Sequence, residues 1–164
     1  MGGYAKAEPL YEKALEINKK TLGRDHAVTA TSFDNLASLY QDMGDYTKAE
    51  PLFLEAVQIR KEIFGLDHRD TARSIGNLGL LYSDMGNYDK AEQLLEEALH
   101  IRERVLGSED PDTAAALSKL GGLYKRRLFT KQNLIMPKQN RCFTKRWKPT
   151  RKSLEPPILS RSSI

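Results

Sequence analysis

Two Asp-His pairs are the residues whose types suggest acid–base or metal chemistry. In Asp25-His26 and Asp67-His68 an imidazole stands beside a carboxylate, a combination found in general bases and in metal sites. The two pairs are 42 residues apart, and the next copy has no histidine, because the sequence there reads Glu109-Asp110-Pro111. Because a catalytic site has no reason to recur in each copy of a repeat, we assign these histidines a structural role in a loop.

Motifs for other kinds of chemistry are missing from the sequence. It contains no Gly-rich phosphate loop, no zinc-ligand spacing and no nucleophile elbow. We therefore expect no catalytic residues, no metal and no cofactor, and the protein is predicted not to be an enzyme. Cys142 is the single cysteine, which suits a reducing compartment, and no apolar stretch is long enough to cross a bilayer. These features predict a cytoplasmic protein without a membrane partner.

The elements that position these residues repeat every 42 residues. The recurring groups keep this spacing without insertion or deletion: Lys6-Ala7-Glu8, Lys48-Ala49-Glu50 and Lys90-Ala91-Glu92; Gly23, Gly65 and Gly107; Thr29, Thr71 and Thr113; Tyr40, Tyr82 and Tyr124. Self-similarity at a fixed period of this length predicts stacked helical repeats. The period divides the chain into a half repeat (1–24), full repeats at about 25–66 and 67–108, and a half repeat at about 109–126.

Each full repeat is predicted to form two helices. The first runs from about residue 25 to residue 42, with Phe33, Leu36 and Tyr40 on one apolar stripe. Gly44 follows and can take a positive φ that ends the helix. The second helix is expected from about residue 46 to residue 64, with a buried side formed by Ala49, Phe53, Ala56, Val57, Ile59 and Ile63. The small residues Ala37, Gly79 and Gly121 are expected to let paired helices approach closely.

The residues of the stripe match a known repeat pattern. Leu78-Gly79-Leu80-Leu81-Tyr82 and Leu120-Gly121-Gly122-Leu123-Tyr124 fit L-G-x2-Y, and Ala49-x3-Phe53 fits the A-x3-F that follows it. Residues 1 to about 125 thus resemble the tetratricopeptide repeat. The longer period, together with residues 98–102 and 105–107, is similar to the subfamily of kinesin light chains and nephrocystin-3-like proteins. The resemblance implies an all-α solenoid of stacked antiparallel helical hairpins, wound into a right-handed superhelix.

The resemblance also implies a peptide-binding groove on the concave face, which the first helices line. Asparagine suits such a groove because its carboxamide both donates to and accepts from a peptide backbone. The expected groove residues are Asp34, Asn35, Ser38, Gln41, Arg73, Asn77, Leu80 and Ser83. The alternative is that Asn35 and Asn77 are merely solvated side chains or local caps. The expected partner is a protein or a peptide.

The charge of the chain changes sign at Lys125. Residues 1–124 contain 14 basic and 21 acidic residues, a net charge of −7, whereas residues 125–164 contain 12 basic residues and one acidic residue, a net charge of +11. Residues 127–164 are therefore predicted to be an irregular, poorly ordered basic tail. An alternative function follows from this segment, that of an adaptor whose residues 125–164 contact nucleic acid or another polyanion. We regard nucleic acid as the less favoured partner.

Both ends of the array are irregular. Met1-Gly2-Gly3-Tyr4 corresponds to Met43-Gly44-Asp45-Tyr46, so the chain begins at the turn inside a repeat. Uncapped helices at either end are expected to expose apolar surface and to favour self-association. Back-translation of residues 130–134 in a shifted frame permits Lys-Ala-Glu-Pro, and residues 152–155 permit Val-Leu-Gly, although the two motifs lie seven residues farther apart than in the intact repeats. The preferred hypothesis for the tail is a frame-shifted repeat, against a nuclear signal in residues 145–152 or a PDZ-binding end in residues 162–164.

Overall fold

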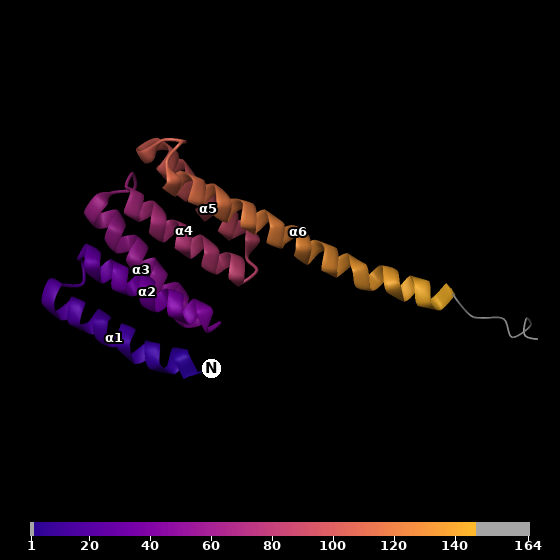
Figure 1. Cartoon of the computed structure of the whole chain (residues 1–164), viewed down its shortest axis with the longest axis horizontal. Coiled ribbons are helices and arrows are strands. Elements are labelled where there is room, and N and C mark those ends of the chain that lie inside the picture. The colour runs from indigo at the N-terminus through magenta and orange to yellow at the C-terminus, as the bar shows by residue number, and fades with distance from the viewer. Residues whose placement is uncertain (1, 147–164) are drawn as a thin grey trace, which may run out of the picture. The chain divides into compact units, whose positions relative to one another are not determined.

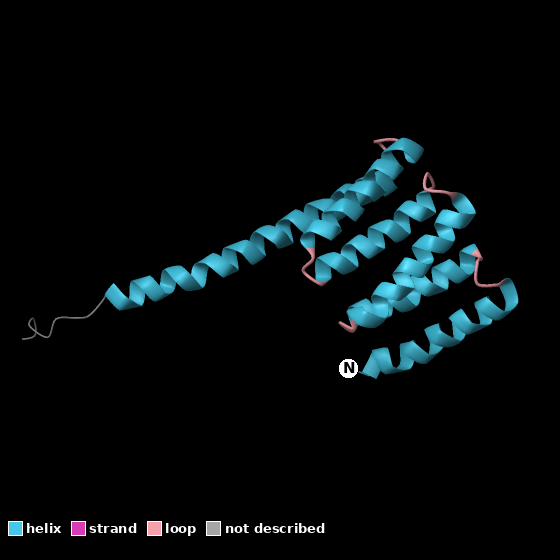
Figure 2. Ribbon diagram, turned by 180° about the vertical axis from the view of Figure 1, so that it is seen from behind, coloured by secondary structure: helices cyan, strands magenta, loops and turns pink. Residues whose placement is uncertain are grey.

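The apolar stripes of the sequence become six α-helices joined by short loops (Figures 1 and 2). The structure is a computed structural model, and it describes residues 2–146. The helices are α1 (Gly2–Leu22), α2 (Ala27–Asp42), α3 (Tyr46–Phe64), α4 (Arg69–Asp84), α5 (Tyr88–Leu106) and α6 (Pro111–Arg146). The described residues contain no strand. The fold is an all-α solenoid of antiparallel hairpins, as the repeats predict.

The order of packing along the solenoid follows the order of the chain. Helix α2 packs on α1 and α3, and α4 packs on α3 and α5. The backbones of the first helices α2 and α4 also approach each other, whereas the backbones of α1 and α3, and those of α3 and α5, do not. The first helices therefore lie closer together than the second helices, which places α2 and α4 on the inner side of the stack.

The turn inside each hairpin is formed by the glycine that the sequence singled out. Gly44 and Gly86 have φ values of 78° and 79°, in the left-handed region that glycine adopts without a steric penalty. The amides of the next residues, Asp45 and Asn87, donate to the carbonyl oxygens of Tyr40 and Tyr82, both at 2.8 Å. The side chains of Asp45 and Asn87 then cap the N-termini of α3 and α5. A few residues thus end one helix and begin the next.

The loop between repeats explains both histidines. The imidazole Nδ1 of His26 accepts a hydrogen bond from the Val28 amide at 3.2 Å, and His68 does the same for Asp70 at 3.1 Å. In the third copy Asp110 accepts from the Asp112 amide at 2.8 Å. These side chains are N-caps, which satisfy amides that a helix N-terminus leaves without a partner. The structural role assigned to the Asp-His pairs is confirmed.

The core consists of the residues on the predicted stripes. Phe33, Leu36, Phe53 and Ile75 are each less than 5% exposed. One residue of the predicted buried side is wrong, because Ile63 is 41% exposed. It lies in the last turn of α3, beyond the part of that helix whose side chains are buried. Val105, one period later, is exposed to the same extent at 40%.

The third repeat departs from the other two at residue 128. The period places Leu128 and Phe129 where the earlier repeats have Gly44-Asp45 and Gly86-Asn87. Without a glycine at this step the chain does not turn, and α6 continues to Arg146. Residues 127–146 are thus helical, and the division at residue 127 into a repeat array and a poorly ordered tail stays a prediction. Residues 147–164 lie outside the described part of the chain, and the frame-shift hypothesis stays a prediction.

The chain divides into two compact units, residues 1–127 and residues 128–164. The first unit contains α1 to α5 and the first part of α6, and every side-chain contact discussed below lies within it. The end helix α1 carries several exposed apolar side chains, among them Leu10 at 69% and Ile17 at 49%. Its sequence repeats that of the second helices α3 and α5. None of the helices in residues 2–146 is long and apolar enough to cross a membrane.

Candidate functional site

The inner face of the solenoid is joined across repeats by side-chain hydrogen bonds that span about one period. Gln41 on α2 donates to Asp84 on α4, and Lys119 on α6 donates to Asn77 on α4 at 3.3 Å. On the same row, Arg126 pairs with Asp84. Each bond links one first helix to the next, so that consecutive first helices form one continuous surface.

The eight residues predicted to line this face differ in exposure. Asn35 and Arg73 are exposed; Ser38, Gln41, Asn77 and Leu80 are half-buried; and Asp34 and Ser83 are buried. Six of the eight thus present side-chain surface to solvent. They come from two consecutive first helices, α2 and α4, which contact each other. The six exposed or half-buried residues are called the inner-face residues below.

Asp34 is 5% exposed because it forms a buried ion pair, so the expectation that its side chain lines an open groove is corrected. Its carboxylate pairs with the guanidinium of Arg60 on α3 and accepts a hydrogen bond from Ser74 on α4 at 3.0 Å. Thr31 accepts a further bond from Arg60 at 3.0 Å. Asp34 thus fastens three helices together. Ser83, 4% exposed, is likewise removed from the candidate surface.

Lys119 lies on the same face as the inner-face residues but is not one of the eight residues predicted from the sequence. It follows Asn35 and Asn77 at the 42-residue step, and its ammonium group contacts the Asn77 carboxamide. Its pKa is lowered, first by desolvation and then by the positive charges of Arg102 and Arg73, while Asp34 opposes the shift. Only its repeat position could have identified it from the sequence, because this position holds an asparagine in the two earlier repeats and a lysine in the third.

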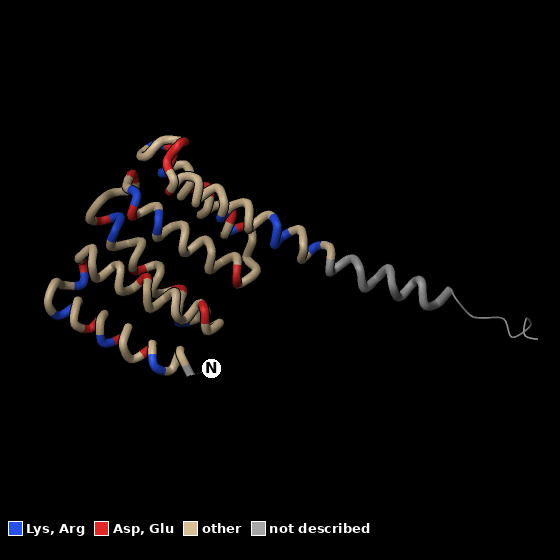
Figure 3. Tube along the Cα trace, in the orientation of Figure 1, with Lys and Arg blue, Asp and Glu red and all other residues tan. Residues whose placement is uncertain are grey.

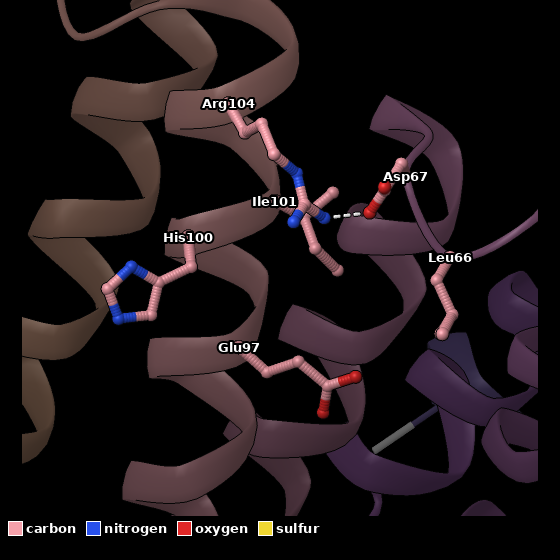
Figure 4. Close-up of a pocket in the computed structure, with 6 residues that line it drawn as sticks. All are labelled: Leu66, Asp67, Glu97, His100, Ile101 and Arg104. Carbon is pink, nitrogen blue, oxygen red and sulfur yellow. Dashed lines mark hydrogen bonds and ion pairs between the residues drawn. The ribbon is translucent and has the colours of Figure 1, made fainter.

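A separate pocket of about 450 Å³ lies on another part of the surface (Figure 4). Leu66 and Asp67 from the loop after α3 line it together with Glu97, His100, Ile101 and Arg104 of α5. An ion pair between Arg104 and Asp67 bridges the two segments. None of the predicted groove residues lines it, and its walls are a second helix and an inter-repeat loop. We therefore place the candidate site on the inner face.

Charges of both signs alternate over the repeats (Figure 3). Two of the three basic residues that follow Tyr124 directly are also engaged by carboxylates. Arg127 pairs with Asp89 at 3.0 Å and with Glu92 at 2.7 Å, and Arg126 pairs with Asp84. These contacts offset the charges of Arg126 and Arg127, which lie in the first unit.

The comparisons with known proteins agree with this geometry. The tetratricopeptide repeat family matches residues 1–62, 28–104 and 77–128, which together cover most of the chain. The chain belongs to the tetratricopeptide repeat family. The inner face is thus formed by the first helices of tetratricopeptide repeats. No curated protein matches the sequence.

Several solved structures of tetratricopeptide repeats are similar to the chain. The crystal structure of BtubC (BKLC) from P. vanneervenii has 27% sequence identity and a TM-score of 0.69, over 98% of this chain and 65% of that one. This chain therefore spans slightly less than two thirds of that relative. A putative kinesin light chain from Podosopora anserina with nearly identical TPR-like repeats has 26% identity and a TM-score of 0.63, over 91% of this chain and 71% of that one. A variant of the same protein gives 26% and 0.65, over 89% and 70%.

These neighbours bear on the predicted subfamily. Similarity to a putative kinesin light chain supports the kinesin-light-chain side of the resemblance. The nephrocystin-3 side stays a prediction. Tetratricopeptide repeats are protein-interaction scaffolds, and this chain has their architecture.

Proposed function

We propose that this chain binds an extended peptide segment of a partner protein along the inner face of its repeats. The observation that carries the proposal is the row of amides on consecutive first helices. Asn35 is exposed and Asn77 half-buried, one period apart. Carboxamides at a regular spacing suit a peptide backbone, because each can donate and accept at once. The role is one of binding without catalysis, and we place it in the cytoplasm.

The surroundings of the amides add specificity to this face. Arg73 is exposed beside the row, where it forms an ion pair of 3.3 Å with Asp70, and half-buried Leu80 offers an apolar contact. Ser38 and Gln41 add further hydrogen-bonding groups on α2. A partner segment that lies across α2 and α4 meets polar groups and one apolar side chain in turn. Such surfaces select side chains as well as backbone.

A peptide-array comparison tests the proposal. The double variant Asn35→Ala/Asn77→Ala should lose at least tenfold in affinity for the peptides that the parent protein captures. The matched control is Gln58→Ala/His100→Ala, which removes two exposed polar side chains that are also one period apart but lie on the second helices α3 and α5. Unchanged binding by the asparagine variant, or equal losses in the two variants, would remove the inner face from the binding site.

The alternative function, contact with a polyanion through residues 125–164, receives less support. Arg126 and Arg127 already pair with three carboxylates of α4 and α5. Of the remaining basic residues, most lie beyond the side chains that the structure describes. Salt-dependent binding of DNA or RNA by residues 125–164 alone would favour this alternative.

A further inference from the structure

Helix α1 exposes apolar side chains whose equivalents in the other second helices are buried. Tyr11 and Ile17 are 39% and 49% exposed, and Leu10 beside them is 69% exposed. The equivalents of Tyr11 and Ile17 one and two periods later are all less than 5% exposed: Phe53, Leu95, Ile59 and Ile101. Helices α3 and α5 each pack on the first helix of their own hairpin, whereas among α1 to α5 the backbone of α1 approaches that of α2 alone. Leu10, Tyr11 and Ile17, called the α1 face below, thus lie where the other second helices pack on their first helix.

The first part of α6 exposes the complementary side of a hairpin. Leu117 and Tyr124 are 49% and 39% exposed, although their equivalents one period earlier, Ile75 and Tyr82, are 1% and 8% exposed. Another side of this segment is covered, since Leu123 is 2% exposed. Leu117 and Tyr124, together with the exposed glycine between them at position 121, are called the α6 face below.

Helices α4 and α5 show how two such faces fit together. A Cβ atom built on Gly79 of α4 would lie 3.3 Å from the Leu94 Cβ of α5, so the two helices approach closely here. The period carries Gly79 to Gly121, where a built Cβ meets nothing within 4 Å. It also carries Leu94, two periods back, to the exposed Leu10. Gly121 and Leu10 are thus the two halves of one contact, on helices at opposite ends of the stack (Figure 1).

A cation beside the two faces matches in the same way. The Lys90 ammonium of α5 lies over the ring of Tyr82 of α4, 4.9 Å from its centroid, and α3 makes the equivalent contact with α2. The period carries this pair to Lys6 on α1 and Tyr124 on α6. Because the two helices lie at opposite ends of the stack, this pair can form only between copies of the chain.

Opposite charges also stand near the loop end of the two faces. In the hairpin of α4 and α5, Arg104 pairs with Asp67 in the loop before α4. The equivalents of these residues are Lys20 on α1 and Glu109 in the loop before α6, and both are exposed. A second copy of this chain therefore brings both apolar surface and a matching charge to the α6 face.

We propose that copies of this chain join head to tail, with α1 of one copy packed on residues 111–127 of the next as the second helix of a hairpin. The apolar side chains that both faces leave in water supply the driving force. The interface is heterologous, because each copy contributes a different surface, so a joined pair keeps a free face at either end and further copies can add. Since α2 follows α1, each joint also continues the row of first helices. This inference stands independently of the proposed function.

Engineered disulfides test which faces meet. In the full chain with Cys142→Ser, the double variant Leu10→Cys/Gly121→Cys carries its two thiols at the equivalents of Leu94 and Gly79. The 3.3 Å between the Cβ positions there is close to the separation of about 3.5 to 4.5 Å in a disulfide. In a glutathione redox buffer this variant should give a ladder of covalent oligomers on a non-reducing gel. Peptide mapping should show links between positions 10 and 121.

The matched control is Glu16→Cys/Gly121→Cys in the same background. Glu16 is exposed on α1, and its equivalent on α5, His100, has a side chain that is 79% exposed. This control should form at least tenfold fewer links than Leu10→Cys/Gly121→Cys. Equal yields from the two variants, or links that join position 10 of one copy to position 10 of another, would overturn the proposal.

Two glycine substitutions test the association without disulfides. Gly121→Gln fills the place of the neighbouring copy's Leu10 and should lower the fraction of dimers and larger species at least threefold in sedimentation velocity. Gly122→Gln is its control, because Gly122 is equally exposed and open but is the equivalent of Leu80, an inner-face residue. It should associate like the parent protein. Circular dichroism checks that both variants fold. A parent protein that stays monomeric at 100 μM, undiminished association of folded Gly121→Gln, or equal losses in the two variants would overturn the proposal.

Discussion

The hydroxyl group of Tyr82 on α4 donates a hydrogen bond of 2.6 Å to the carboxylate of Glu50 on α3. The same contact joins Tyr40 to Glu8 at 3.0 Å and Tyr124 to Glu92 at 2.8 Å. Each first helix is thus tied to the second helix before it by a charge-assisted bond of its tyrosine, the stronger kind of hydrogen bond, and Tyr40 also contacts Glu12 at 3.3 Å. The Lys-Ala-Glu and Leu-x3-Tyr motifs recur together because they supply the two ends of this bond.

Stability should fall at alkaline pH because of these tyrosines. The bond to Glu50 and burial raise the pKa of Tyr82 to about 12, and burial and Glu8 do the same for Tyr40. Since an exposed tyrosine titrates near pH 10, the bond contributes fully below about pH 10 and is lost as the pH rises towards about 12. Tyr82→Phe should lower the free energy of unfolding by about 1 to 2 kcal/mol at pH 8. Above pH 10 the difference in this free energy between the variant and the parent protein should shrink.

Urea unfolding followed by circular dichroism at several pH values measures this effect. Tyr4→Phe is the matched control, because Tyr4 lies on α1 with 44% of its surface exposed. If the difference in free energy of unfolding between the parent protein and Tyr82→Phe stays constant from pH 8 to pH 11.5, the bond to Glu50 does not raise the pKa of Tyr82.

The sequence predicted the helices well because their ends are set locally. The predicted second helix, residues 46–64, coincides with α3, since Gly44 and Gly65 impose turns that need no distant partner. The burial of Asp34 could not be predicted in this way, because it depends on a distant part of the chain. Its position on α2 follows from the period, but its burial depends on Arg60, which reaches it from another helix. Helical periodicity gives the face of a residue, and only packing shows what covers that face.

The same limit applies to the third repeat. Its composition indicates an irregular tail after residue 126, whereas Leu128 stands in the place of a turn glycine and α6 continues past it. The loss of an Asp34 equivalent at Gly76 is visible in the sequence, but only the structure shows that Arg102, one period after Arg60, is buried as well.

Breaking the buried ion pair should be costly. Asp34→Asn removes the counter-charge of Arg60, which is 1% exposed, and should destabilise the protein by about 3 to 5 kcal/mol, the range for a buried charge left without its partner. Asp34→Leu/Arg60→Met removes both charges and should recover at least half of that loss. Thermal unfolding with a chemical-denaturation check measures both. A double variant as unstable as Asp34→Asn would show that the charge is not the cause.

Substitution by alanine should have opposite effects on stability at two glycines that occupy equivalent repeat positions. A Cβ on Gly79 would lie 3.0 Å from the Leu95 Cγ and 3.3 Å from the Leu94 Cβ, so α5 would have to shift. Nothing lies within 4 Å of a Cβ on Gly121, one period later, where no second helix packs. Gly79→Ala should cost about 1 kcal/mol through overpacking. Gly121→Ala should stabilise by about 0.5 to 1 kcal/mol through helix propensity. Equal effects in urea titrations would contradict the role of Gly79 in close packing.

The exposed apolar side of α1 should drive self-association. Leu10 and Ile17 are 69% and 49% exposed on a helix that repeats the sequence of a second helix. Leu10→Lys/Ile17→Lys should lower the fraction of dimer or larger species in sedimentation velocity. Leu10→Gln/Ile17→Gln removes the same apolar surface without adding charge and should lower the fraction equally. A parent protein that stays monomeric at 100 μM would remove this prediction.

Restoring the missing glycine should shorten α6. Leu128→Gly gives the chain the residue that ends α2 and α4, where φ reaches 78° and 79° at Gly44 and Gly86. Glycine within a helix also costs about 1 kcal/mol relative to alanine, so both effects favour an end near residue 128. Backbone ¹³C chemical shifts should show less helix after residue 128 and unchanged helix in residues 111–127. Leu128→Ala, which gains no access to positive φ, should leave α6 intact, and an identical loss of helix in both variants would show that the turn glycine is not what separates the third repeat from the first two.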